Sequence, residues 1–373
     1  MQGLCRLIFM KTLEPRDTYE LIGHKQNEQF ILKAWEKDKI PHALLLSGPR
    51  GVGKATFAFR VARFLLHARD SDQNRQNGLD FGQQSAHETL AVPKETIVGR
   101  QIANNAHPNL LVIQRSESLQ TKKIRSEIVI DDLKSLKKFV NLKASDGHWR
   151  VVIIDTIDEM NRNSANAILK LLEEPPRKVI FILICNSTGR LLPTIKSRCQ
   201  LLKFTALSKD DLVFALQSSG ADLEESDIDI IYQLSSGSMK LAKEILSSDF
   251  LENLNDIIEL TSGVWPVFVA NGEAIFEKWQ KSIKQDATAV LEDKILIAKN
   301  WLSYGLIQYS RSNGSYLAAL KDEEELFERL INTHGIEKLL GRLHDIERLV
   351  IRSKGLNLDK KETFFSFIRL LTE

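Results

Sequence analysis

A glycine-rich segment has the residue types and the spacing of a phosphate-binding loop. The segment Gly48-Pro-Arg-Gly51-Val-Gly53-Lys54-Ala55 matches the pattern G-x-x-x-x-G-K-[S/T] at every position except the last. Glycines let backbone N–H groups turn inward around phosphate oxygens, the following helix end adds partial positive charge, and the lysine contacts the terminal phosphates. Because an apolar run precedes the segment and a helical pattern follows it, we favour this interpretation over a glycine-rich turn that contains a lysine by chance.

The last position of this loop normally carries Ser or Thr, whose hydroxyl binds Mg²⁺. Ala55 occupies that position and has no oxygen to offer. Thr56 comes next, but it points about 100° further around the helix and is a poor substitute. We therefore expect weakened metal binding, and we assign no metal ligand in this chain.

A second acidic motif follows another apolar run. Residues 151–154 are Val-Val-Ile-Ile and Asp155 follows them, which is the usual place for the Mg²⁺-orienting carboxylate of a P-loop ATPase. The next residue in AAA+ ATPases is a glutamate that activates the attacking water, and here it is Thr156. A hydroxyl of this pKa is no general base near neutral pH. A shifted assignment to Asp158-Glu159 is less consistent, because those residues do not leave an apolar strand directly.

Ser197-Arg198-Cys199 follows an apolar run at residues 179–184 and a short segment at 191–196. An arginine beyond the last strand of such a domain can project from the domain edge. Its planar fork suits the γ-phosphate bound by a neighbouring subunit, as an arginine finger in trans. The alternative is an ordinary surface or salt-bridged arginine, and the position alone does not decide between the two.

Apolar runs and helical patterns alternate in the first half of the chain. The runs cover residues 42–46, 110–113, 151–154 and 179–184, and the helical patterns cover 54–67, 130–141 and 164–174. Continuous apolar runs are typical of parallel strands covered by helices on both faces. The pattern predicts a three-layer α/β P-loop domain over residues 1–205. A polar stretch at about 68–109 predicts a long surface insertion.

The strand signals disappear from about residue 206. Short helical patterns at 210–218, 227–235 and 239–246 predict a small helical lid domain over residues 206–249. Residues 250–373 are almost wholly helical in pattern; residues 338–351, for example, place their apolar side chains on one broad face. We expect this last block to be an all-helical collar domain that serves oligomerisation.

Composition excludes several classes of protein. Hydrophobic residues make up 43% of the 373 residues and charged residues 27%, which is typical of a soluble globular protein. Residues 1–13 are too short and too broken by Arg6 for a secretory signal, so we expect a cytoplasmic location. The three cysteines form no CxxC pair, so we expect no zinc site. The net charge of +2 indicates that any nucleic acid is contacted through a local patch and together with partners.

In order along the chain, a set of short segments resembles the clamp-loader branch of AAA+ proteins. The segments are Ile22-Gly23-His24, His42-Ala43, residues 48–54, His107-Pro108-Asn109, residues 151–155, Asn166-Ala-Ile-Leu-Lys-Leu-Leu-Glu-Glu-Pro-Pro176 and Ser197-Arg198-Cys199. The resemblance covers about the first two hundred residues and extends to Gly237-Ser238. Asn357-Leu358 adds weak support in the last block. The segment ending in Pro175-Pro176, together with Ser-Arg-Cys, is the most specific part.

This resemblance implies a pentameric ring, held together by helical collars, that opens a sliding clamp and places it on primed DNA. It implies that a fixed subunit without ATPase activity lends the arginine of Ser-Arg-Cys, here Arg198, to the adjacent motor subunit. The sensor positions of the family fall on Asn186-Ser187 and on Lys240, where motors usually carry arginine. Gly48, Gly51, Gly53, Lys54, Asp155 and Lys240 then form a vestigial nucleotide site. Weak ATP binding stays open, and no cofactor is required.

The sequence is compatible with three functional hypotheses. The first is a non-hydrolysing subunit that completes the active site of a neighbour, which Ala55 and Thr156 favour. The second is a working AAA+ ATPase motor. The third is an unrelated P-loop kinase, which predicts a phosphate-acceptor site and no ring, and which leaves the helical last third unexplained.

Overall fold

The computed structural model describes residues 14–76, 87–116, 125, 127–141, 149–246, 249–262, 267–285, 291–311, 323–356 and 358–372. The apolar patch at residues 1–13, residues 77–86 of the predicted insertion, and Asn357 lie outside the described residues. The chain divides into two compact units, with the boundary between Asp211 and Leu212. Each unit is described by itself below.

The first unit is built on a parallel sheet. Its strands are β1 (Ala43–Ser47), β2 (Leu110–Gln114), β3 (Arg150–Asp155), β4 (Val179–Cys185) and β5 (Gln200–Lys203). Their order across the five-stranded sheet is β2-β3-β4-β1-β5, and every neighbouring pair runs parallel. The apolar runs predicted four of these strands. They gave no signal for β5, because Leu202 is the only buried residue of this strand.

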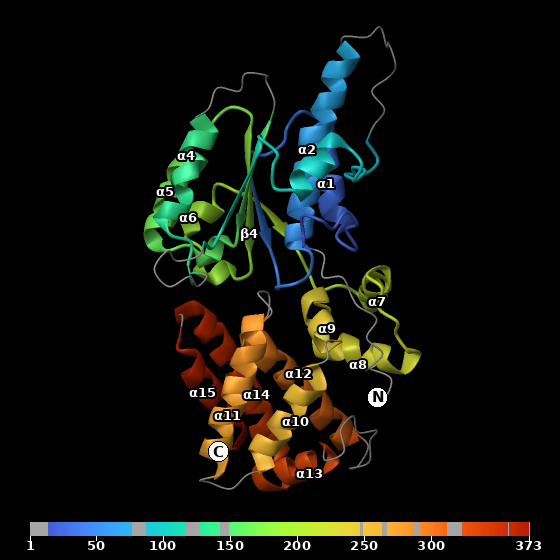
Figure 1. Ribbon diagram of the computed structural model, residues 1–373, viewed down its shortest axis with the longest axis vertical. Helices are drawn as coiled ribbons and strands as arrows, with labels where there is room; N and C mark the ends of the chain where they lie inside the picture. The colour runs from blue at the N-terminus through green and yellow to red at the C-terminus, as the bar shows by residue number, and fades with distance from the viewer. Residues whose placement is uncertain are drawn as a thin grey trace. The chain divides into compact units, whose positions relative to one another are not determined.

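Helices cover both faces of the sheet (Figure 1). One layer contains α1 (Lys25–Glu36), α2 (Lys54–Gln76) and α3 (Ile97–Ala103), and the other contains α4 (Lys134–Asn141), α5 (Arg162–Glu173) and α6 (Pro193–Lys196). Val151 and Ile153 of β3 point into the first layer, whereas Val152 and Ile154 point into the second. All four side chains are fully buried. The prediction of a parallel α/β sheet covered by helices is confirmed.

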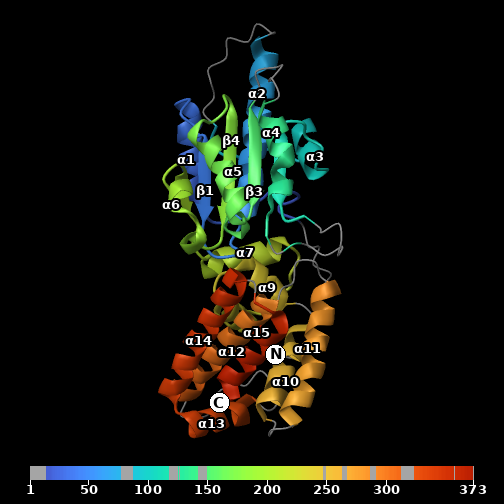
Figure 2. The same cartoon turned by 90° about the vertical axis from the view of Figure 1, so that its left-hand side faces the viewer.

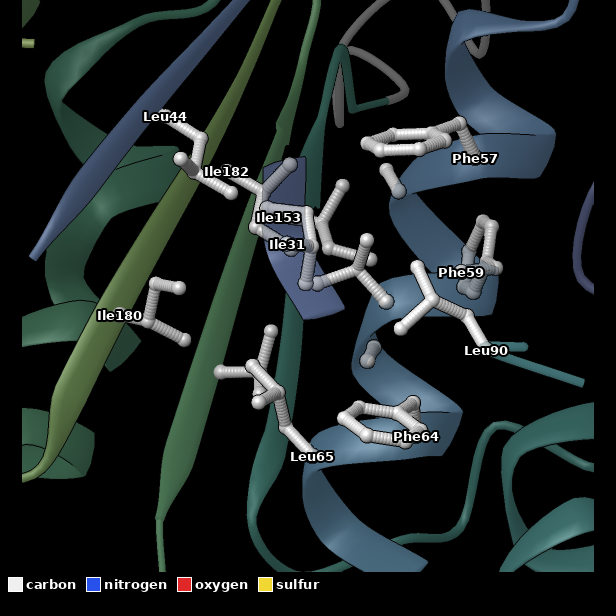
Figure 3. Close-up of a cluster of buried hydrophobic side chains, with 14 of the residues drawn as sticks. Ile31, Leu44, Phe57, Phe59, Phe64, Leu65, Leu90, Ile153, Ile180 and Ile182 are labelled. Atoms are coloured by element: carbon white, nitrogen blue, oxygen red, sulfur yellow. The ribbon is translucent and has the colours of Figure 1, made fainter. Parts of the chain in front are cut away.

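The core between the sheet and α2 fixes the helix that follows the phosphate loop. Figure 3 shows Phe57, Phe64 and Leu65 of α2 turned toward the sheet, where Ile153 and Ile182 meet them. Burial of each such side chain stabilises the fold by about 1.5–3 kcal/mol. The first residue of α2 is Lys54, so this apolar packing also holds the phosphate loop in place.

The region predicted as a polar surface insertion is more ordered than its composition indicates. Helix α2 continues to Gln76, beyond the predicted end at residue 67. Leu90 and the α3 residues Val98 and Ile102 are buried in the first core layer. Most residues of the segment are polar, so its sequence pattern did not reveal these few apolar residues. Their side chains pack residues 87–103 against the domain.

In its described residues the second unit consists of helices and the turns that connect them. It contains the greater part of α7 (Lys209–Ser218), followed by α8 (Glu225–Ser235), α9 (Met239–Ile245), α10 (Asp249–Ser262), α11 (Val267–Gln285), α12 (Leu291–Arg311), α13 (Glu323–His334), α14 (Ile336–Leu356) and α15 (Lys360–Thr372). Figure 2 shows α10 to α15 packed side by side. Helices α8 and α9 contact α12 in the same compact unit. The helical C-terminal region is confirmed, and its division into a lid and a collar stays a prediction.

Two tryptophans with hydrogen-bonded indoles lie at the centre of this helical unit. The Nε1–H of Trp279 donates to Asp256 Oδ2 at 2.9 Å, and that of Trp301 donates to Glu323 Oε1 at 2.9 Å. Both carboxylates are buried, so the hydrogen bonds offset part of their desolvation.

None of the helices described combines the length and the apolar composition of a membrane span.

Two helical glycines of this unit differ in their surroundings and provide a test of the packing. A Cβ added at Gly305 of α12 would lie 2.1 Å from the Phe327 ring, whereas one added at Gly341 of α14 meets nothing within 4 Å. We expect Gly305→Ala to lower the midpoint of thermal unfolding, because overpacking typically costs about 1–3 kcal/mol. Gly341→Ala should raise it, because alanine is favoured over glycine in a helix by about 1 kcal/mol. Thermal unfolding followed by circular dichroism measures both, and equal effects would contradict the packing described.

Candidate nucleotide site

The parallel sheet gathers the predicted site residues at one edge, because the carboxyl ends of parallel strands all face the same way. Strand β1 leads into the phosphate loop, and β3 ends at Asp155. Strand β4 lies between them and leads into Asn186. The N–H of Gly48 donates to Cys185 O at 3.3 Å, which joins the loop to the end of β4. The structure thus brings the loop, Asp155 and the Asn186 sensor position to the same edge.

Each glycine of the loop has a physical reason to be glycine. A Cβ on Gly48 would lie 2.0 Å from the carbonyl oxygen of Phe204, so only glycine permits this close approach. Gly51 and Gly53 have φ values of +79° and +103°, in the region where side chains are strained. These residues therefore shape the turn that a phosphate group requires.

Lys54 is folded into the loop that it terminates. Its side chain is 4% exposed, and its Nζ donates to Gly48 O at 2.8 Å and also to Pro49 O. Burial lowers the pKa of Lys54 to about 8, although Asp158 and Asp155 act in the opposite direction. The ion pairs found in the described part of the chain do not include Lys54. Its buried charge therefore has carbonyl dipoles as hydrogen-bonding partners.

Asp155 and Thr156 contact each other at the end of β3. The Oγ1 of Thr156 donates to Asp155 Oδ1 at 3.2 Å. Burial raises the pKa of Asp155, while this hydrogen bond and the charges of Lys54, Arg50 and Arg115 partly oppose the rise. The residue that replaces the catalytic glutamate is thus a hydrogen-bond donor to the acidic residue beside it.

The neighbouring carboxylates of Asp158 and Glu159 have protein partners. The two carboxylate oxygens of Asp158 accept the N–H groups of Asn186 and Ser187, each at 3.0 Å. Glu159 pairs with Nε of Arg115 at 3.0 Å. Burial raises the pKa of Glu159, and Arg115 opposes this. These contacts give Asp158 and Glu159 a positioning role and do not favour the shifted acidic motif.

Sequence reasoning did not single out Arg115. The signal was present, because Arg115 directly follows β2, whose carboxyl end lies beside that of β3. His24 entered only as part of a family resemblance. Its Nε2 lies 2.8 Å from Val52 O and its ring lies 4.5 Å from that of Phe204, so it holds the phosphate loop from the N-terminal side. Burial lowers the pKa of His24.

The donor set at this edge does not fit the Mg²⁺ ion that P-loop ATPases carry. Ala55 supplies no hydroxyl, and Asp155, Asp158 and Glu159 each accept a hydrogen bond or an ion pair from the protein. Within the described ranges, no group of three or more His, Cys, Asp or Glu side chains is arranged to hold a metal ion.

Arg198 lies in the turn between α6 and β5, on the surface of the first unit. Its guanidinium donates to Thr194 O at 2.9 Å and pairs with Glu173 at 2.9 Å. The side chains of Arg198 and Glu173 are 33% and 48% exposed. An exposed ion pair of this kind contributes at most about 1 kcal/mol, so its exchange for another anion costs little.

Lys240 lies in the second unit and is engaged there. Its Nζ is 2.5 Å from Asp293 Oδ2, which joins α9 to α12. A second pair between these helices places Lys294 3.7 Å from Glu244. Asn300 of α12 also donates to Leu234 O at 2.7 Å. These contacts account for Lys240 without a nucleotide, and its assignment as a sensor stays a prediction.

A parallel α/β domain with a glycine-rich loop between β1 and α2 is a P-loop nucleotide-binding module. Residues 23–208 match the family described as DNA polymerase III, delta subunit. DNA polymerase III subunit gamma of Buchnera aphidicola subsp. Schizaphis graminum is 27% identical over 368 residues, which cover 96% of this chain and 93% of that relative. DNA polymerase III subunit delta' of Pseudomonas aeruginosa is 32% identical over 222 residues, which cover 58% of this chain and 60% of that relative.

The crystal structure of a DNA polymerase III gamma-subunit-related protein from Thermotoga maritima is also similar, at 18% identity. The alignment covers 91% of this chain and 98% of the Thermotoga chain. Its TM-score is 0.40. The sequence relatives carry the assignment instead. This chain belongs to the AAA+ clamp-loader family that includes the gamma, tau and delta' subunits of DNA polymerase III.

The ion pair of Lys240 with Asp293 can be tested through its contribution to the stability of the second unit. We expect Lys240→Met to destabilise the second unit by about 3 kcal/mol, because it removes the ammonium that pairs with the buried Asp293 carboxylate. The double variant Lys240→Met/Asp293→Leu should recover most of this loss, because no buried charge remains unpaired. Chemical denaturation followed by tryptophan fluorescence measures both. Full stability of the single variant would contradict the role assigned to the pair.

Proposed function

We propose that this chain is a delta'-type subunit of the DNA polymerase III clamp loader, which helps to load the sliding clamp onto primed DNA. In this proposal it is a non-hydrolysing stator that supplies Arg198 as an arginine finger to a neighbouring motor. The observation that carries the proposal is the loss of two independent catalytic groups, at Ala55 and at Thr156.

The chemistry of hydrolysis explains why these two positions matter. ATP hydrolysis requires a metal ion that neutralises the developing charge on the phosphates, and it requires a residue that activates or orients the attacking water. Ala55 has no oxygen for the metal. Thr156 is no general base, and its hydroxyl donates to Asp155.

The surroundings of Arg198 support its role in trans. It is partly exposed, and its ion pair with Glu173 is a surface contact. A guanidinium can exchange one carboxylate for the phosphate oxygens of a nucleotide bound by an adjacent subunit with little loss, because it binds both groups in the same forked geometry. The ordinary alternative is that Arg198 serves only to fasten α5 to the α6–β5 turn.

The partners in this proposal are the gamma or tau motor and the delta subunit, assembled with this chain into a hetero-pentamer through the helical C-terminal region. The chain meets the sliding clamp and primed DNA through the complex, in agreement with its net charge of only +2. We propose a cytoplasmic location. No zinc or other cofactor is required.

An active motor of the gamma or tau type is the second candidate. The gamma subunit of Buchnera aphidicola, which is similar along 96% of this chain, favours it. Lys54 and Asp155 are retained, as a motor requires.

The two candidates differ in the activity of the purified chain. We expect no magnesium-dependent ATP turnover above background, because metal ligation and water activation are both impaired. Release of inorganic phosphate measures this, with Lys54→Ala as the control for contaminating ATPases. Turnover that Lys54→Ala abolishes would establish the motor and refute the stator.

The finger is tested in a reconstituted loader in which the other motor sites are disabled. We expect Arg198→Ala to slow hydrolysis at the adjoining motor on the order of 10³-fold, since fingers of this kind contribute factors of that size. Assembly, measured by size-exclusion chromatography, should be unchanged.

Two matched variants control for surface effects. Arg177→Ala removes an exposed arginine of the same unit, and Glu173→Gln removes the surface partner of Arg198. Both should keep hydrolysis near the unmodified rate. Loss of assembly in Arg198→Ala, with no separate effect on hydrolysis, would identify Arg198 as a merely structural residue.

A further inference from the structure

The acidic side of the phosphate site is satisfied by the protein itself. Asp155 accepts the hydroxyl of Thr156, and Asp158 accepts two backbone N–H groups through its two oxygens. Glu159 pairs with Arg115 at 3.0 Å. A divalent cation bound here would have to displace these donors, and it would lack the hydroxyl that Ala55 has replaced.

On the basic side of the site, the charge of Lys54 is matched by neutral acceptors and not by an anion. Lys54 is almost completely buried, and its ammonium donates to the carbonyl oxygens of Gly48 and Pro49. A buried ammonium is stabilised far better by an anion than by neutral dipoles. The loop around it retains the glycines that turn N–H groups toward a phosphate.

We propose that this loop binds the polyphosphate chain of a nucleoside triphosphate without a divalent cation, with Lys54 as the principal counter-charge. Arg115 and Thr156 then act as positioning residues, because they occupy the carboxylates that would otherwise hold the metal. The inference rests on the non-hydrolysing site of the proposed function. It is independent of the arginine finger.

Lys54 has to leave its carbonyl partners when the nucleotide binds. The two hydrogen bonds are local, since Gly48 and Pro49 lie six and five residues before Lys54. Rotation of one side chain exchanges two neutral carbonyl acceptors for anionic phosphate oxygens, so the ammonium gains an ion pair in place of two dipoles. The carboxylates need not move.

The test measures ATP binding to the full chain by isothermal titration calorimetry, once with excess EDTA and once with excess MgCl₂. We expect the dissociation constants to differ by less than about threefold, since a site that uses the metal to bridge the phosphates would depend on it strongly. Lys54→Met should abolish binding in both buffers. Binding that requires Mg²⁺, or no binding in either buffer, would overturn the proposal.

A double variant tests whether the named residues cause the metal independence. Ala55→Thr/Arg115→Gln restores the missing hydroxyl and releases Glu159, so ATP affinity should become dependent on Mg²⁺ by more than about tenfold. Its thermal unfolding, measured alongside, confirms that the variant is folded. An affinity that stays indifferent to Mg²⁺ in the folded variant would refute the role of these residues.

Two further arms identify the bound group and separate the proposals. Inorganic tripolyphosphate should compete with ATP, because the contacts are made to phosphates; absence of competition would contradict the assignment. Arg177→Ala should leave ATP affinity unchanged, since Arg177 is an exposed arginine outside this loop, and the finger assay measures hydrolysis at the site of a neighbouring subunit. Failure of metal-free binding would therefore leave the finger assay intact, and failure of the finger would leave this titration intact.

Discussion

The approach of Gly48 to the backbone of Phe204 is the constraint on which the site depends. It sets the end of β1 against the segment that follows β5, and a single methyl group at Gly48 would lie 2.0 Å from the Phe204 carbonyl oxygen. Phe204 also packs against Phe57 of α2 and against His24, so one contact region fixes the loop, the helix after it and the segment before α1. The buried sheet then places β3 and β4 beside the loop. Core packing thus maintains the shape of the phosphate loop, whether or not the site is catalytic.

Charge balance distinguishes this site from that of a hydrolysing P-loop enzyme. In such an enzyme the metal ion joins the acidic residues to the phosphates. Here protein donors satisfy the acidic residues, and the buried Lys54 is left with carbonyl partners. The proposed stator role needs a stable domain edge and an accessible Arg198, and an internally neutralised site is compatible with both. The similarity to a gamma subunit extends along nearly the whole chain.

The helical unit uses charge differently. The pair of Lys240 with Asp293 joins α9 to α12, which are far apart in the sequence, whereas the indole hydrogen bonds of Trp279 and Trp301 join the consecutive helices α10 and α11, and α12 and α13. Buried polar contacts of this type add little net stability but penalise alternative packings, because any other arrangement leaves a charge unpaired. The ion pairs of Lys240 and Lys294 join α9 to α12, and the helices predicted as a separate lid share one compact unit with the helices that follow.

The sequence by itself determined the apolar strands β1 to β4, the glycine-rich loop, the helical second half, and the absence of a hydroxyl at Ala55 and of a carboxylate at Thr156. These features are local, since each is encoded by a run, a period or a single side chain. Tertiary structure alone decided the pairing of Arg115 with Glu159, the capping of Asn186 and Ser187 by Asp158, and the engagement of Lys240 by Asp293. It also decided the edge strand β5 and the helix α3, which have too few buried residues to give a pattern. The physical reason is that strand order and helix packing bring distant residues together, and no local period records which distant residue becomes a neighbour.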